Sequence, residues 1–143
     1  MPAHLSPVLA NPSRPRVIYD GDCGVCCACI EWLRRRDGDA LEFLPLQSPN
    51  VARLGLPLEK LRQSIHLVEP DGTVFNAAAA ALRLLARNPR QAHWLRWYER
   101  DAVFAELSEA VYAFVARNRG AVSWLLGRFG PRAFARVVCR LPG

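Results

Sequence analysis

Four of the five cysteines in this 143-residue chain lie within seven positions, at Cys23, Cys26, Cys27 and Cys29. The thiolate is the reactive form of cysteine, and a pair of neighbouring thiols can exchange with a partner's disulfide through a mixed disulfide. A group of thiolates can instead hold a metal such as zinc. The cluster therefore predicts either redox or metal chemistry.

The residues before the cluster predict a strand, a turn and a helix. Residues 17–19 (Val-Ile-Tyr) are β-formers and too few for a helix, which is typical of a buried strand. Asp20, Gly21 and Asp22 then break the strand and offer side-chain oxygens to cap a helix that starts near Cys23. Asp20 is expected to be that cap, or alternatively to relay a proton from Cys26.

Helical spacing of about 100° per residue separates the thiols. It places Cys26 and Cys29 on the apolar stripe, Cys27 on the flank, and Cys23 on the exposed first turn. Free N–H groups at a helix N-terminus favour a thiolate at Cys23, although the carboxylates of the preceding turn oppose it. Cys27 and Cys29 are interpreted as bystanders, with Cys27 an extra resolving thiol or a glutathionylation site if it is exposed.

The metal alternative requires ligands that surround an ion. Structural zinc sites usually join two separated ligand pairs, whereas three of these thiols crowd onto two turns of one helix. Downstream of the cluster the sequence has no second Cys-x-x-Cys or His pair, and His66 lies between apolar neighbours, as a core or edge histidine would. Cys139 is expected to be an isolated thiol. We therefore favour redox chemistry. The alternative is a metal-binding module that holds zinc or an iron–sulfur cluster, most readily a cluster shared across a dimer.

The following residues predict an α/β protein with a mixed four-stranded sheet, built from a βαβ unit, a β-hairpin and a helix. The expected elements are a strand at 41–44, a short helix at 58–62, strands at 64–68 and 73–75, and a helix at 77–87 with Asn76 as its N-cap.

Residues 1–15 carry four prolines and are expected to form a flexible tail before a single domain at 16–143. From about residue 91 a helical extension is expected. Two sets of side chains in it are expected to pack against other elements: one apolar helix face (Val103, Leu107, Ala110, Val111, Phe114, Val115) and an aromatic cluster over one face of the sheet (Trp94, Trp97, Tyr98, Trp124).

Composition limits the partners. The net charge of +6 comes almost wholly from scattered arginines, and no recognition motif supports nucleic-acid binding. No apolar run reaches the roughly 18 residues of a membrane span, and the N-terminus lacks a basic segment followed by an apolar one. We expect a cytoplasmic protein without a transmembrane segment.

The segment Tyr19-Asp-Gly-Asp-Cys-Gly-Val-Cys26 resembles the DCC family of predicted thiol-disulfide oxidoreductases. The similarity continues through residues 43–47, 64–72 and 112–119 and covers roughly 16–128. It implies a thioredoxin-like fold, with Cys23 as the attacking thiol and Cys26 as the resolving thiol. The partner would be a disulfide-containing protein or a low-molecular-weight thiol, and no cofactor would be needed.

The chain departs from thioredoxin-like proteins in one place, because Gln63 or Ser64 occupies the position of their usual cis-proline. A function from another class also fits the sequence: a non-catalytic interaction module whose cysteines sense redox state.

Overall fold

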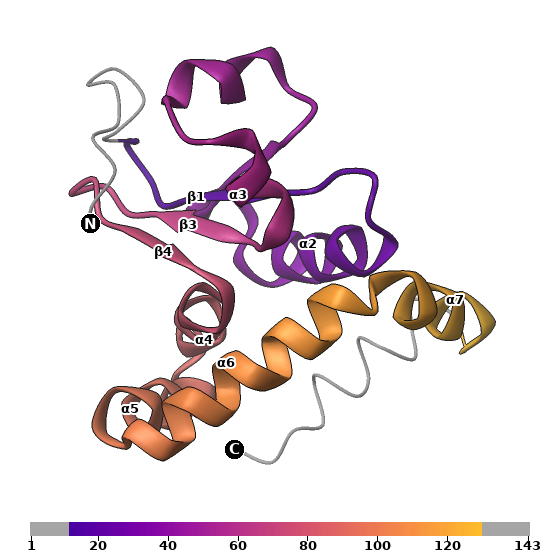
Figure 1. Ribbon diagram of the computed structural model, residues 1–143. Coiled ribbons are helices and arrows are strands. Elements are labelled where there is room, and N and C mark those ends of the chain that lie inside the picture. The colour runs from indigo at the N-terminus through magenta and orange to yellow at the C-terminus, as the bar shows by residue number, and fades with distance from the viewer. Residues whose placement is uncertain (1–11, 130–143) are drawn as a thin grey trace. The chain divides into compact units, whose positions relative to one another are not determined.

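The computed structural model describes residues 12–129, so Cys139 lies outside the described residues. The chain divides into two compact units, Met1–Phe75 and Asn76–Gly143. The first unit contains the sheet and the cysteine helix, and the second is helical (Figure 1). That residues 16–143 behave as a single domain stays a prediction.

The sheet of the first unit has four strands in the order β2-β1-β3-β4. β1 (Arg16–Tyr19) pairs in parallel with β2 (Glu42–Pro45) and antiparallel with β3 (His66–Val68), and β4 (Val74–Asn76) lies beside β3. The predicted α/β class, with a mixed sheet of thioredoxin-like type, is confirmed.

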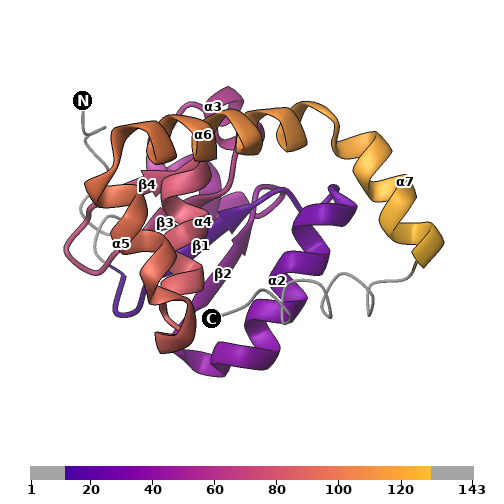
Figure 2. The ribbon, with the colours of Figure 1, turned by 90° about the horizontal axis from the view of Figure 1, so that it is seen from below.

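The connections of this unit follow the expected order. α2 (Gly24–Asp37) and a 3-10 turn, η1 (Gly38–Ala40), join the parallel strands β1 and β2. A second 3-10 segment, η2 (Pro49–Leu54), precedes α3 (Leu58–Gln63), which contacts β1. The βαβ unit predicted around the cysteines is therefore confirmed, and Figure 2 shows α2 running along the sheet.

The core of the first unit consists of aliphatic side chains from β1, β2, η2, α3 and β3: Ile18, Leu44, Leu46, Val51, Leu54, Leu61 and Val68. His66 is also buried, and its Nδ1 lies 2.9 Å from the carbonyl oxygen of Ser64. Burial lowers the pKa of His66, with the Ser64 contact acting in the opposite direction. The prediction that His66 is a core or edge residue is confirmed.

As far as residue 129, the second unit contains four α-helices and a 3-10 turn: α4 (Ala77–Ala86), η3 (Pro89–Gln91), α5 (Ala92–Arg100), α6 (Ala102–Arg117) and α7 (Arg119–Phe129). α4, α5 and α6 contact one another, and α7 contacts α6. The predicted helical extension is confirmed as far as residue 129. Asn76 is the N-cap of α4, as expected, but its side chain makes no capping hydrogen bond.

The expected packing of the α6 apolar face is wrong within the described residues. Val103 is 76% exposed and Leu107 is 59% exposed, and Val111 and Phe114 are exposed as well. Helical periodicity places these side chains on one face but contains no information about whether another element covers it.

The aromatic cluster is only partly as predicted. Trp97 stacks on Phe104 with ring centroids 4.3 Å apart, and Trp94 stacks on both rings. The Tyr98 hydroxyl instead donates a hydrogen bond to Glu109, and the exposed Trp124 lies under Arg128. The expectation missed Phe104 because it was based on residue type along the sequence, whereas the stack joins α5 to α6.

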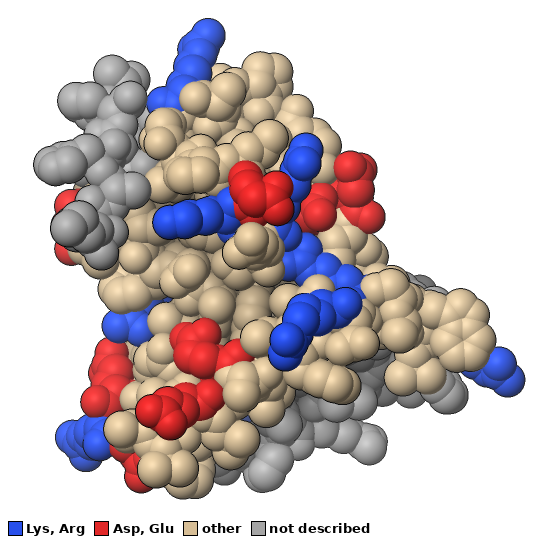
Figure 3. All heavy atoms as spheres, viewed as in Figure 1, with Lys and Arg blue, Asp and Glu red and all other residues tan. Residues whose placement is uncertain are grey.

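Acidic and basic side chains are interspersed on the face shown in Figure 3. Near the N-terminus, the Pro15 carbonyl accepts a hydrogen bond from the Glu42 N–H.

Among residues 12–129, no helix has the length and apolar character needed to cross a membrane.

Candidate active site

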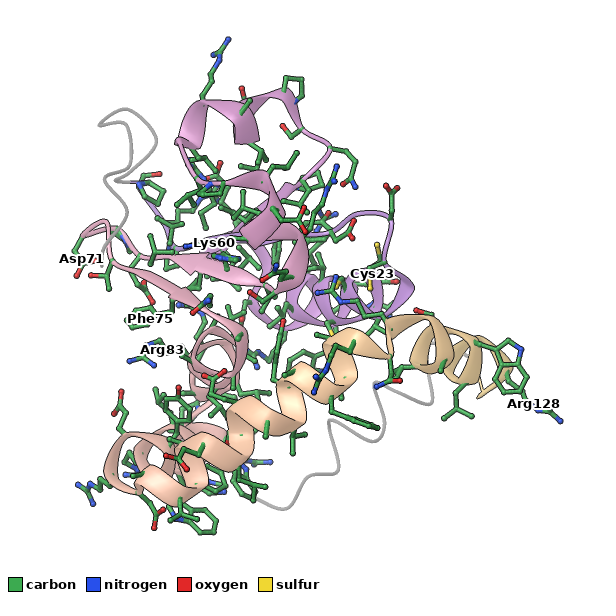
Figure 4. The ribbon with its side chains drawn as sticks, in the orientation of Figure 1. Cys23, Lys60, Asp71, Phe75, Arg83 and Arg128 are labelled. Atoms are coloured by element: carbon green, nitrogen blue, oxygen red, sulfur yellow. The ribbon has the colours of Figure 1, made fainter. Side chains whose placement is uncertain are left out.

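The cysteine cluster lies where β1 ends and α2 begins (Figure 4). Cys23 is the N-cap residue of α2, and its carbonyl accepts the N–H of Cys27 at 2.9 Å, the first bond of the helix. The predicted start near Cys23 is confirmed. Since β1 and β2 are parallel, their carboxyl ends lie at the same sheet edge, where open α/β sheets usually place their sites.

The expected capping role of Asp20 is wrong. Cys23, not an aspartate, occupies the N-cap position, and its side chain makes no capping bond. Asp20 Oδ1 accepts a hydrogen bond from the N–H of Asp22, a residue before the helix, at 3.0 Å. The Cys23 N–H donates to the backbone carbonyl of Asp20 at 3.3 Å. Asp20 therefore closes the loop before the helix, and its role as a proton relay stays a prediction.

Cys23 is 8% exposed, so its expected exposure is also wrong. The residue has an extended backbone, with φ −93° and ψ 118°, and helical spacing does not apply to a residue outside the helix. Cys26 follows in the first turn of α2 and is half-buried. Both are free thiols, and they lie near each other at the helix start.

Cys27 is the exposed thiol of the cluster, and its Sγ donates a hydrogen bond to the Gly21 carbonyl at 3.2 Å. Its pKa is raised, first by partial desolvation of the sulfur and then by the negative charges of Cys23, Asp20 and Asp22. At neutral pH Cys27 is therefore an accessible thiol that resists ionisation.

Cys29 is held protonated by its surroundings. Burial, followed by the nearby Cys23, raises its pKa to about 11. Its interpretation as a bystander is consistent with this protonation but stays a prediction. Within residues 12–129, no group of three or more His, Cys, Asp or Glu side chains is arranged to hold a metal ion.

Gln47, for which the sequence suggested no role, holds the loop before the cysteines. Its Oε1 accepts the Gly21 N–H at 3.0 Å, and its Nε2 donates to Asp20 Oδ1 at 3.1 Å and to Asp22 Oδ2 at 2.9 Å. The available signal in the sequence was the position of Gln47, three residues after the strand predicted at 41–44, which was expected to run parallel to the strand before the cysteines. The usual cis-proline has no counterpart here, since residues 12–129 contain no cis peptide bond.

Comparison with known proteins agrees with this arrangement. The family model described as DCC1-like thiol-disulfide oxidoreductase matches residues 17–125. A protein of Bacillus subtilis strain 168, named "Uncharacterized protein YuxK", is 28% identical over 110 residues, which cover 72% of this chain and 76% of that protein. No solved structure matches significantly. Since the family match spans most of the chain, this protein belongs to the DCC1-like thiol-disulfide oxidoreductase family.

Proposed function

We propose that this protein is a thiol-disulfide oxidoreductase that reacts through Cys23 and Cys26. The observation that carries the proposal is the position of Cys23, at the N-cap of α2 and one three-residue loop after the buried strand β1, with Cys26 in the first helical turn. Backbone N–H groups at a helix start favour an anionic sulfur at that position. Membership of the family supports redox chemistry at this pair.

The reaction proceeds in two exchanges. The Cys23 thiolate attacks one sulfur of the partner's disulfide, forms a mixed disulfide and releases the other sulfur as a thiolate, which takes up a proton. The Cys26 thiol loses its proton and attacks the Cys23 sulfur, which releases the second partner thiol. Two electrons pass to the partner, and Cys23 and Cys26 end as an intramolecular disulfide.

The low exposure of Cys23 limits the size of the disulfide that can reach its sulfur. A small disulfide reaches a buried sulfur more easily than a disulfide within a folded protein does. We therefore expect faster exchange with low-molecular-weight disulfides than with protein disulfides. In a reducing compartment such as the cytoplasm, the pair would be regenerated by the thiol pool.

A glutathione redox titration of the purified protein tests this function. Mass spectrometry of alkylated protein should show a two-electron transition to a Cys23–Cys26 disulfide, at a potential within the roughly −120 to −270 mV span of known oxidoreductases. Cys23→Ser should abolish the transition, whereas the matched control Cys29→Ser should retain it. If no Cys23–Cys26 disulfide forms at any glutathione ratio, the proposed function is wrong.

A further inference from the structure

One neutral side chain, Gln47, bridges all three residues of the loop that leads into Cys23. It makes one hydrogen bond to the backbone of Gly21 and two to the carboxylates of Asp20 and Asp22. The partners fix the orientation of the amide, because a backbone N–H can only donate and an ionised carboxylate can only accept. One nitrogen therefore bonds to both of the carboxylates in the loop that precedes Cys23.

The fold brings Gln47 to this loop from 25 to 27 positions away. The last pair in the parallel register of β1 and β2 is Tyr19 with Pro45, and the Leu46 N–H continues the pairing by donating to the Tyr19 carbonyl at 2.8 Å. The next residue of each chain segment, Asp20 and Gln47, then meets at the shared carboxyl edge. The contact is thus a direct consequence of the strand register.

Gly21 has no Cβ, which leaves room for the Gln47 amide. A Cβ at position 21 would lie 2.7 Å from Gln47 Oε1, which is too close for any side chain to share the position with the bridge. The carbonyl of Gly21 also accepts the thiol of Cys27 at 3.2 Å. The amide bridge and the cysteine cluster are therefore connected through one residue.

The bonds from Gln47 to the two carboxylates affect how easily the nearby thiols ionise. Negative charges next to a thiol oppose its ionisation, and both carboxylates act in that direction on Cys27. An amide N–H that donates to both carboxylates draws their charge density away from the sulfurs and holds them in place. A carboxylate at position 47 would do the opposite, since it cannot donate and would add a third negative charge.

We propose that Gln47 is a positioning residue for disulfide exchange, which holds the Asp20–Asp22 loop so that its carboxylates do not suppress the thiolate of the reacting cysteines. This inference rests on the proposed function. Gln47 acts through the loop and is not expected to contact the reacting sulfurs.

The test measures the rate at which the reduced protein cleaves a small aromatic disulfide that releases a coloured thiolate, from pH 6 to pH 10. Gln47→Glu keeps the acceptor for Gly21 but loses the donor and adds a charge. We expect its rate at pH 7 to fall by about fivefold and its pH–rate profile to move to higher pH. Asn88→Asp adds the same charge at the N-cap of η3, where a carboxylate can also accept the Arg90 N–H, and should leave the profile unchanged.

A charge swap separates positioning from a general loss of structure. When Gln47→Glu is combined with Asp22→Asn, the amide and the carboxylate exchange places. The number of charges is restored, and the new amide at position 22 can donate to the new carboxylate at position 47. This double variant should recover part of the rate that Gln47→Glu loses, because two contacting residues are not energetically independent. Recovery should be incomplete, because the new carboxylate at position 47 still faces Asp20 Oδ1, to which Gln47 donates at 3.1 Å. Circular dichroism should show equal folding of all variants.

The two proposals fail in different ways. If the wild type exchanges disulfides and Gln47→Glu does so with an unchanged rate and pH profile, the role of Gln47 is refuted and the proposed function stands. A swap that recovers none of the lost rate also refutes the role of Gln47. If the wild type itself does not exchange, both proposals are wrong.

Discussion

The two units of this protein treat their apolar residues differently. In the first unit the aliphatic side chains converge on a closed core, in which Ile18 and Leu54 are 0% exposed. In the second unit a 16-residue helix, α6, keeps a row of large apolar side chains exposed. An amphipathic pattern thus gives a core only where the fold supplies a second surface.

The polar groups differ in the same way. In the first unit a single amide, that of Gln47, joins the segment after β2 to the loop after β1, through bonds to the three residues that precede Cys23. In the second unit, polar side chains link helices to each other, as in the bond from the Tyr98 hydroxyl to Glu109 and the ion pair of Arg83 with Glu99. The polar contacts of Gln47 in the first unit thus lie at the loop before the proposed reacting cysteines, whereas those of the second unit join helices.

The largest expected effect is the loss of stability when a buried core side chain of the first unit is truncated, compared with an exposed one on α6. Leu54→Ala should lower the free energy of unfolding by about 3 kcal/mol, because it removes fully buried methyl groups and leaves a cavity. Leu107→Ala removes the same atoms from a side chain that is 59% exposed and should cost less than about 0.5 kcal/mol. Urea unfolding followed by circular dichroism measures both. Equal losses would mean that the α6 row is buried in solution.

A smaller effect concerns the buried thiol of the first unit. The pKa of Cys29 rises from its ordinary value of 9.0 to about 11 in the folded protein. Between these values the unfolded chain has lost the proton and the folded chain keeps it, so stability is complete below pH 9 and falls as the pH rises. The loss should reach about 2 kcal/mol by about pH 11.

Urea unfolding of the wild type and Cys29→Ala at about pH 7.5, 9 and 11 measures this contribution as a difference between the two proteins. The wild type should lose more stability than the variant as the pH rises. If the two lose stability in parallel, Cys29 does not lie in an environment that opposes its ionisation.

The smallest effect tests the polar link within the second unit. Tyr98→Phe removes the 2.8 Å hydrogen bond to Glu109 and should lower the free energy of unfolding by about 1 kcal/mol. Because the pKa of Tyr98 is raised, mainly by desolvation, spectroscopic titration should show one tyrosine that ionises late and is missing in Tyr98→Phe.

Much of the local structure could be predicted from the sequence. The run at residues 17–19, the break at Gly21 and the following helical pattern place a strand, a turn and the start of α2 within one or two residues of their observed positions. These features depend on backbone preferences and on periodicities that neighbouring residues encode. The resemblance of the cysteine motif to the family could also be recognised from a short contiguous segment, residues 19–26.

The tertiary structure decided what those elements do to one another. Gln47 meets Asp20 and Asp22 only because β2 pairs in parallel with β1, and residues that far apart carry no local signal of the contact. The burial of Cys23 and the exposure of Leu107 contradict the expectations from helical spacing. Spacing fixes which residues share a face, but the free energy of burying that face depends on the surface that meets it, which only the folded chain provides.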